Sequence, residues 1–277
     1  MSILNAVLRT VFDLFLAPFA GMPPWVGLTL MSFLVSIFML LVFKATSNQV
    51  ALKAVKSQIH AGLFEIRLFN DDLRAILRSQ FEILGHNARY LKLSLVPMVW
   101  VLPPLFLMIA QMQFHYAYGG FEPGDQTLLT VQLADSVPTD SPRPQIELST
   151  PEGIAVETAG VWVPSRNEMT WRLGLEAEGD YEVQIQLNDA TYAKSLRVAG
   201  TRVVRRSPIK VGSSILDQLI YPAEPPLSAE AEIASIELAY PERDIEYFGF
   251  GTHWMVWFFA LSMVFAFALR NRLGVTI

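Results

Sequence analysis

Three long apolar stretches divide this chain, at residues 25–43, 93–114 and 254–269. The first two contain 19 and 22 residues without a charged side chain, and the third contains 16. A helix needs about 20 apolar residues to cross a hydrocarbon core of about 30 Å. The third stretch reaches that length only with the uncharged run at 247–253. The pattern therefore predicts three membrane spans; the alternative is three buried helices of a large soluble core.

Charge is unevenly distributed between these stretches. Residues 44–92 carry eight basic and four acidic side chains, whereas residues 116–252 carry ten basic and 21 acidic ones. Because Lys and Arg favour the cytoplasmic side, we expect residues 44–92 and the C-terminus in the cytoplasm and the acidic segment outside. The acidic segment has no Asn-x-Ser/Thr sequence, which fits a bacterial inner (cytoplasmic) membrane.

The first 20 residues predict an amphipathic helix that lies in the membrane interface. Ser2, Asn5, Arg9 and Asp13 form a polar stripe at helical spacing, and apolar residues cover the rest of the helix. Such a helix binds a bilayer through its apolar face. Arg9 and Asp13 interrupt what would be the apolar region of a signal peptide. An uncleaved signal anchor is the alternative.

The cytoplasmic segment shows two runs of helical periodicity, before and after residues 70–72. Asn70 is a plausible helix stop, and Asp71 or Asp72 a plausible N-cap. We expect a coiled-coil-like helical hairpin whose first helix continues directly from the first span. The alternative is an ordinary helix pair with a solvated charged face. The basic residues that we expect to contact a partner are Lys53, Lys56, Arg67, Arg74 and Arg78.

The outside segment has the alternation of a β domain. Short runs that alternate apolar and polar residues recur every 8–12 residues, and Gly, Pro, Asn and Asp separate them, which is typical of an antiparallel sandwich. Residues 201–206 and 209–211 are candidate edge strands. Arg202, Arg205 and Arg206 form a small basic cluster that we interpret as a solvated strand edge.

The fold class we expect is thus a membrane α-helical protein with three spans, a cytoplasmic hairpin, an N-terminal interfacial helix and an inserted all-β sandwich. Its expected segments are the interfacial helix at 1–20, the first span at 21–44, the hairpin at 45–92, the second span at 93–118, the sandwich at 119–246, and the third span with its tail at 247–277.

Composition excludes several kinds of chemistry. The chain has no cysteine, which excludes disulfides and thiolate metal sites. A net charge of −5 argues against DNA binding. No phosphate-binding, zinc-protease or serine-hydrolase motif occurs. The four histidines do not fall at metal-ligand spacing. We therefore predict a protein that is not an enzyme and has no catalytic residues, metal or cofactor.

The apolar stretches contain a few polar side chains of interest. Thr29, Ser32 and Ser36 lie on one face of the first span, Lys44 closes its cytoplasmic end, and Ser262 lies near the middle of the third span. Small polar residues of this kind serve close helix packing. They also fit a mildly polar strip that receives client helices. Pro97, Pro103 and Pro104 would break backbone hydrogen bonds in the second span and hold it open on one side.

The order of these parts resembles the YidC/Oxa superfamily of membrane insertases, and its three-span relatives in particular. The resemblance rests on residues 2–118 and 247–272, and the outside β domain is an addition to that pattern. It implies insertion or chaperoning of membrane proteins without nucleotide, through a groove open to cytoplasm and lipid. Carried over by position, Thr29, Ser32, Ser36 and Ser262 would line the groove, with Lys44 at its mouth.

The expected partners follow from that resemblance and from the topology. They are the lipid bilayer, nascent or unfolded membrane-protein clients captured by the hairpin, with the ribosome as a candidate beside them, and a protein partner of the outside domain. The other hypothesis is a non-catalytic structural or receptor subunit, anchored by its spans, whose β domain binds a partner outside.

Overall fold

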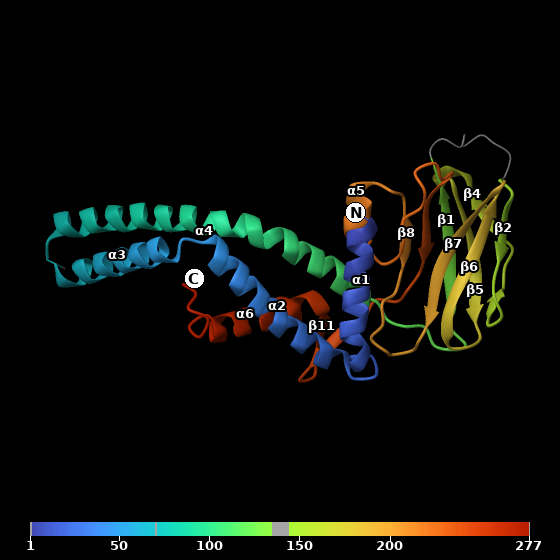
Figure 1. Cartoon of the computed structure of the whole chain (residues 1–277), viewed down its shortest axis with the longest axis horizontal. Helices are drawn as coiled ribbons and strands as arrows, with labels where there is room; N and C mark the ends of the chain where they lie inside the picture. The colour runs from blue at the N-terminus through green and yellow to red at the C-terminus, as the bar shows by residue number, and fades with distance from the viewer. Residues whose placement is uncertain (1, 70, 135–143, 277) are drawn as a thin grey trace. The chain divides into compact units, whose positions relative to one another are not determined.

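The computed structural model describes residues 2–69, 71–134 and 144–276. The chain forms two compact units, one made of Met1–Leu28 and Leu107–Trp257 and the other of Thr29–Phe106 and Phe258–Ile277. The first unit holds the N-terminal helix and the β domain, and the second is helical (Figure 1). A helical part plus a β domain is what the sequence predicts, although the N-terminal helix belongs to the β-domain unit.

Among the described residues, two helices are long and apolar enough to cross a membrane, α2 (Pro24–Thr46) and α4 (Leu73–Tyr116). The third apolar helix, α6 (Trp254–Leu269), has 16 residues, or about 24 Å at 1.5 Å per residue. The uncharged run before it does not lengthen the helix as expected. It forms part of a β-hairpin of β10 (Asp244–Tyr247) and β11 (Phe250–His253).

The predicted cytoplasmic hairpin consists of α3 (Gln49–Leu68) and the first part of α4, which run side by side (Figure 1). The helices approach closely at Gly62, where an added Cβ would lie 2.7 Å from Cγ1 of Ile83. The Asp72 carboxylate accepts a hydrogen bond from the Arg74 amide at 2.9 Å, as an N-cap does. The predicted stop at Asn70 lies outside the described residues.

Two details of this region differ from expectation. The first span does not continue directly into the hairpin, because α2 ends at Thr46 and Asn48 caps α3 by accepting from the Ala51 amide at 3.0 Å. The second arm of the hairpin and the second predicted span form one helix of 44 residues, α4. This helix continues through Pro97, Pro103 and Pro104, each of which lacks the backbone N–H of a helical hydrogen bond.

The described part of the β domain, residues 119–134 and 144–246, is built from two antiparallel sheets. The larger sheet has the order β3-β5-β1-β9-β8, with β4 also paired to β5, and the smaller has the order β2-β6-β7. Alternate residues of both sheets share one core, so that Val131 and Trp171 of the larger sheet belong to the same cluster as Ile185 of the smaller. The strands are β1 (Gln126–Leu133), β2 (Ile146–Ser149), β3 (Ile154–Val156), β4 (Val161–Val163), β5 (Glu168–Leu175), β6 (Gly179–Leu187), β7 (Ala190–Val198), β8 (Ile209–Val211) and β9 (Ile233–Leu238).

The shorter elements complete the first unit. The predicted edge strand at 209–211 is β8, whereas residues 201–206 form no strand. A six-residue helix, α5 (Ile215–Ile220), follows β8 and is capped by Ser214. Single 3₁₀ turns lie at Ala17–Phe19 (η1) and Pro164–Arg166 (η2).

The N-terminal helix α1 (Ser2–Leu16) docks on the β domain through the polar stripe predicted for it. The Asn5 side-chain amide donates to the Gln218 carbonyl, and Arg9 donates to the Pro222 carbonyl at 3.1 Å. The stripe therefore faces protein, and the opposite face of the helix presents exposed apolar side chains. They are Ile3, Leu4, Val7, Val11, Leu14 and Phe15.

Candidate functional sites

A groove of about 380 Å³ lies in the helical unit, between α2, α4 and α6. Its walls are mainly apolar, and its two serines are Ser36 of α2 and Ser262 of α6. Among the lining residues, Phe259 and Met263 are exposed, with 46% and 59% of their surface accessible to solvent. Pockets that bind small ligands start near 300 Å³. The groove therefore has room for a few side chains of a guest helix. The other lining residues are Val35, Met39, Leu40, Phe43, Val101, Leu105, Phe258 and Ala266.

The two serines supply the polar chemistry of the groove. The Ser36 hydroxyl lies 2.6 Å from the Ser32 carbonyl, one turn earlier, and 3.0 Å from the Ser262 carbonyl. The Ser262 hydroxyl oxygen is buried and has no hydrogen-bond partner among the described residues. A buried hydroxyl without a partner is costly.

The predicted groove residues fall into two groups. Ser36 and Ser262 meet, as expected, but Thr29 and Ser32 do not belong to the lining. Lys44 is exposed and does not belong to the lining, and its ammonium donates to the Leu273 carbonyl at 2.6 Å, just after α6. It fastens the C-terminal turn to α2.

Sequence reasoning did not identify the groove wall contributed by α4. Val101 and Leu105 stand one helical turn apart, around Pro103 and Pro104. Their four-residue spacing beside the proline pair was the available signal, because a proline removes a backbone donor and weakens the helix around it.

The hairpin presents both charge and apolar surface. Arg67, Arg74 and Arg78 are exposed, as is Lys53, while Lys56 is partly buried. Arg78 forms an ion pair at 3.0 Å with Glu82, one turn further along α4. Large apolar side chains are exposed among these basic residues on both helices and the turn between them. They are Leu63, Phe64, Leu68, Phe69, Leu73, Leu77, Phe81 and Leu84.

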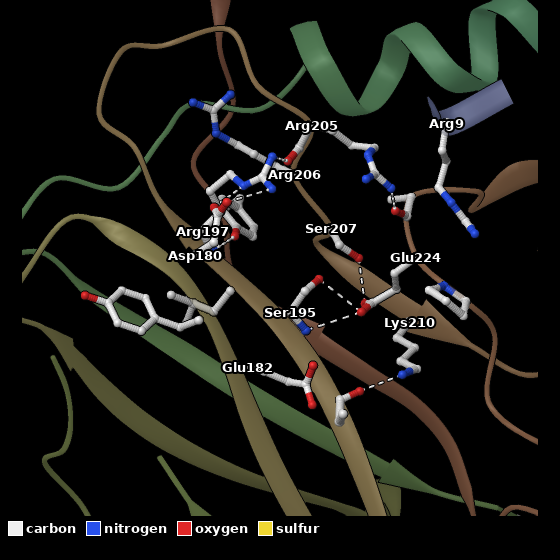
Figure 2. A pocket seen from close by; sticks show the side chains of 16 residues that line it. Arg9, Asp180, Glu182, Ser195, Arg197, Arg205, Arg206, Ser207, Lys210 and Glu224 are labelled. Carbon is white, nitrogen blue, oxygen red and sulfur yellow. Dashed lines mark hydrogen bonds and ion pairs between the residues drawn. The ribbon is translucent and has the colours of Figure 1, made fainter. Parts of the chain in front are cut away.

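A second cavity, of about 420 Å³, lies in the β-domain unit and is lined largely by charged and polar side chains (Figure 2). At its centre, Glu224 accepts hydrogen bonds from Ser207 Oγ at 2.6 Å and Ser195 Oγ at 3.0 Å. Glu224 also forms an ion pair with Lys194, whose side chain is fully buried. Burial lowers the pKa of Lys194, and the Glu224 carboxylate acts in the opposite direction.

The basic cluster near this cavity is not a solvated strand edge, as the sequence suggested. Arg206 is buried, and its two terminal nitrogens donate to four backbone carbonyls, those of Tyr118, Gly200, Arg202 and Val204, at 2.7–3.3 Å. Arg205 donates to Asp13 of α1 through two nitrogens, at 2.8 and 3.2 Å. These arginines hold the loop after β7 and the helix α1 in place.

The Asp13 carboxylate also lies 3.1 Å from Nε2 of His115, a buried residue of α4 in the same unit, within hydrogen-bond distance. Burial acts to raise the pKa of Asp13. The hydrogen bond with His115 and the charge of Arg205 together outweigh it and lower the pKa. His115 is thus a structural histidine. Within the described ranges, no group of three His, Cys, Asp or Glu side chains could hold a metal ion.

Comparison with family models, curated proteins and solved structures finds no match to this chain. The resemblance to the YidC/Oxa superfamily therefore stays a prediction that rests on the order of the elements.

Proposed function

We propose that this chain is an integral membrane protein of the insertase or chaperone kind, which binds membrane-protein segments in the groove between α2, α4 and α6. The observation that carries the proposal is the buried Ser262 hydroxyl, without a hydrogen-bond partner among the described residues, in an apolar groove of about 380 Å³. A rotamer change that turns this hydroxyl into the groove would let it bind a polar atom of a passing segment, which lowers the cost of bringing that atom into the bilayer.

Two further features support the proposal. Met39 and Met263 belong to the lining, and methionine side chains adapt to guests of different shape. The hairpin adds exposed apolar side chains between basic ones, such as Phe64, Leu68 and Phe81 beside Arg67 and Arg78. Exposed apolar surface rimmed by polar residues marks interaction sites. We assign the hairpin to the capture of clients on the cytoplasmic side.

The remaining topology belongs to the same proposal. α6 acts as a short third span, which requires local thinning of the bilayer because about 24 Å is less than about 30 Å. The β domain lies outside a bacterial inner membrane, and the hairpin and C-terminus lie in the cytoplasm. Thinning beside the groove shortens the path that a polar segment crosses, so no nucleotide is needed.

Site-specific photo-crosslinking tests the proposal. The crosslinks are formed in membranes while a test membrane protein is being synthesised. The crosslinker is placed at Met263, which lines the groove, or at the neighbouring Val264, which does not. The two side chains are equally exposed, at 59% and 62%, so that they form a matched pair. We expect crosslinks to the nascent client at Met263 and to lipid alone at Val264. Equal client crosslinking at both positions would refute a groove-specific site.

The competing function is a receptor or structural subunit whose β domain binds a partner outside. The observation that favours it is the polar cavity of the β domain (Figure 2). A crosslinker at Glu182 of β6, an exposed residue of the cavity lining, reports on a protein partner there. Strong crosslinks at Glu182 with none at Met263 would replace the insertase proposal by this one.

A further inference from the structure

The polar cavity of the β domain holds more positive than negative charge, although the segment around it is strongly acidic. Its lining has five cationic side chains and three acidic ones. The whole segment 116–252 has ten basic residues and 21 acidic ones. Figure 2 shows the charged side chains converging from α1, β6, β7, β8 and the loops between them. The local excess of positive charge is therefore a property of the cavity and not of the domain.

Ion pairs account for only part of this charge. Arg197 pairs with Asp180, and Arg205 pairs with Asp13 outside the lining. Glu224 is occupied by the buried Lys194 behind the wall. Within each pair, the positive and the negative charge balance. The remaining cations of the cavity are left without a carboxylate in an ion pair.

Three cations remain, Arg9, Arg206 and Lys210. Among the described residues, no carboxylate lies within ion-pair distance of these three cations. Of the three acidic residues in the lining, Glu182 alone forms no ion pair with a described residue. The partners of all three are neutral carbonyls, such as Pro222 for Arg9 at 3.1 Å. Carbonyls satisfy the hydrogen bonds of a cation but leave its charge uncompensated, which is costly at buried sites.

Arg206 shows that cost most directly. Its side chain is 1% exposed, and its Nε has no hydrogen-bond partner among the described residues. Burial lowers the pKa of Arg206 to about 9, and the charges of Arg243 and Arg197 add to the shift. Burial and the charge of Arg205 likewise lower the pKa of Arg9, and the charges of Asp13 and Glu224 oppose this shift only in part. Arg9 is thus repelled by Arg205, and Arg206 by Arg243 and Arg197, in a partly dry site, and an anion beside them would relieve that repulsion.

We propose that this cavity binds a phosphate-bearing anion, whose charge is balanced by Arg9, Arg206 and Lys210. Phosphate oxygens accept several hydrogen bonds from arginine and lysine. The Tyr240 hydroxyl adds a donor, because burial raises its pKa to about 12 and keeps it protonated. At about 420 Å³, the cavity has room for a phosphate that carries a small polar group such as glycerol.

The position of Arg9 indicates which kind of molecule supplies the anion. Arg9 belongs to α1, whose opposite face exposes Val7, Val11 and other apolar side chains suited to the bilayer surface. A site framed by such a helix lies where lipid headgroups are found. The headgroup of an anionic glycerophospholipid and a free phosphate ester share the required chemistry, and the experiment separates them.

The experiment uses the full chain in nanodiscs, with glycerol 3-phosphate and phosphatidylglycerol as probes. In one arm, calorimetry measures binding of glycerol 3-phosphate to protein in phosphatidylcholine nanodiscs. In the other, native mass spectrometry counts phosphatidylglycerol molecules retained when the protein leaves mixed nanodiscs. The test variant is the double substitution Arg9→Gln with Lys210→Gln. Arg166→Gln, an exposed arginine outside the cavity, is the control.

We expect binding in at least one arm, about tenfold weaker in the double variant and unchanged in the control. Binding in the first arm indicates a soluble phosphate ester, and retention in the second alone indicates a lipid headgroup. Amide exchange of β6 and β7 must match wild type in every variant, so that lost binding cannot be due to unfolding. No binding in either arm, or equal binding by the double variant, would overturn the proposal. Neither result bears on the groove, so the two proposals fail independently.

Discussion

The ion pair between Lys194 and Glu224 gives the largest stability effect that the structure predicts. The Lys194 side chain is fully buried and that of Glu224 is 9% exposed. Replacing Glu224 by Gln preserves its size but removes the negative charge, so that the Lys194 ammonium keeps neutral partners, the Ser207 oxygens and the Gln amide oxygen. Removing one partner of a buried pair costs about 3–5 kcal/mol. Since 1.4 kcal/mol corresponds to a tenfold change in an equilibrium constant, the domain of the variant should open roughly 100- to 4,000-fold more often than that of the wild type.

Amide hydrogen exchange of β6 and β7 in the full chain measures this opening. We expect exchange in Glu224→Gln to accelerate by that factor, and the double variant Lys194→Met with Glu224→Gln to recover most of the loss, since no unpaired charge remains. The control is Arg166→Gln, which removes an exposed ion pair to Glu168 at 3.5 Å and should change exchange by less than about fivefold. Acceleration below threefold in Glu224→Gln would refute the reasoning.

The same pair predicts a pH dependence. Burial lowers the pKa of Lys194, and Glu224 opposes that shift, so the pKa falls further in Glu224→Gln. A lysine with a lowered folded pKa makes the unfolded state bind more protons, so stability rises with pH up to the unfolded value of about 10.4. The deficit of the variant should therefore shrink as the pH rises toward about 10.4. A deficit that grows over this window contradicts the assignment.

Three smaller predictions concern other parts of the chain. The lowered pKa of Asp13 stabilises the docking of α1 above about pH 4 and ceases to do so as the pH falls further; Asp13→Asn should remove this step in the spin-label distance between α1 and α5. Gly62→Val places a Cβ 2.7 Å from Cγ1 of Ile83 and should widen the α3–α4 distance, at a cost of about 1–3 kcal/mol; an unchanged distance contradicts the packing. Ser36→Ala removes a hydrogen bond between α2 and α6 worth about 0.6 kcal/mol and should lower the thermal midpoint in detergent by about 1–3 °C.

The strands of the β domain could be predicted because alternation reports directly on burial. In β6, Val183, Ile185 and Leu187 are buried and the residues between them are exposed. The same logic fails for the run before α6, where Phe-Gly-Phe-Gly carries no charge and fits either a helix or a turn. The structure forms a turn there, with positive φ at Phe248 and Gly249. The glycines were the available signal, because they favour that conformation.

The sites could be predicted only in part, because periodicity identifies a shared face but not the partner that covers it. Ser32 and Ser36 lie on one face of α2, yet only Ser36 lines the groove. Arg206 illustrates the limit more strongly. Charged residues are usually exposed, and its burial depends on carbonyls from Tyr118 and from residues 200–204. No local pattern reveals a set of partners so far apart in the chain.

The most direct test of the groove is insertion by the purified protein. Liposomes that contain wild-type protein or the groove-filling variant Ser262→Phe receive a membrane-protein client with one polar translocated segment, without nucleotide, and protease protection of that segment is measured. We predict protection with the wild type, and little above empty liposomes with Ser262→Phe, because a ring there occupies the groove of about 380 Å³. Protection that is equal in wild-type, variant and empty liposomes would contradict the account.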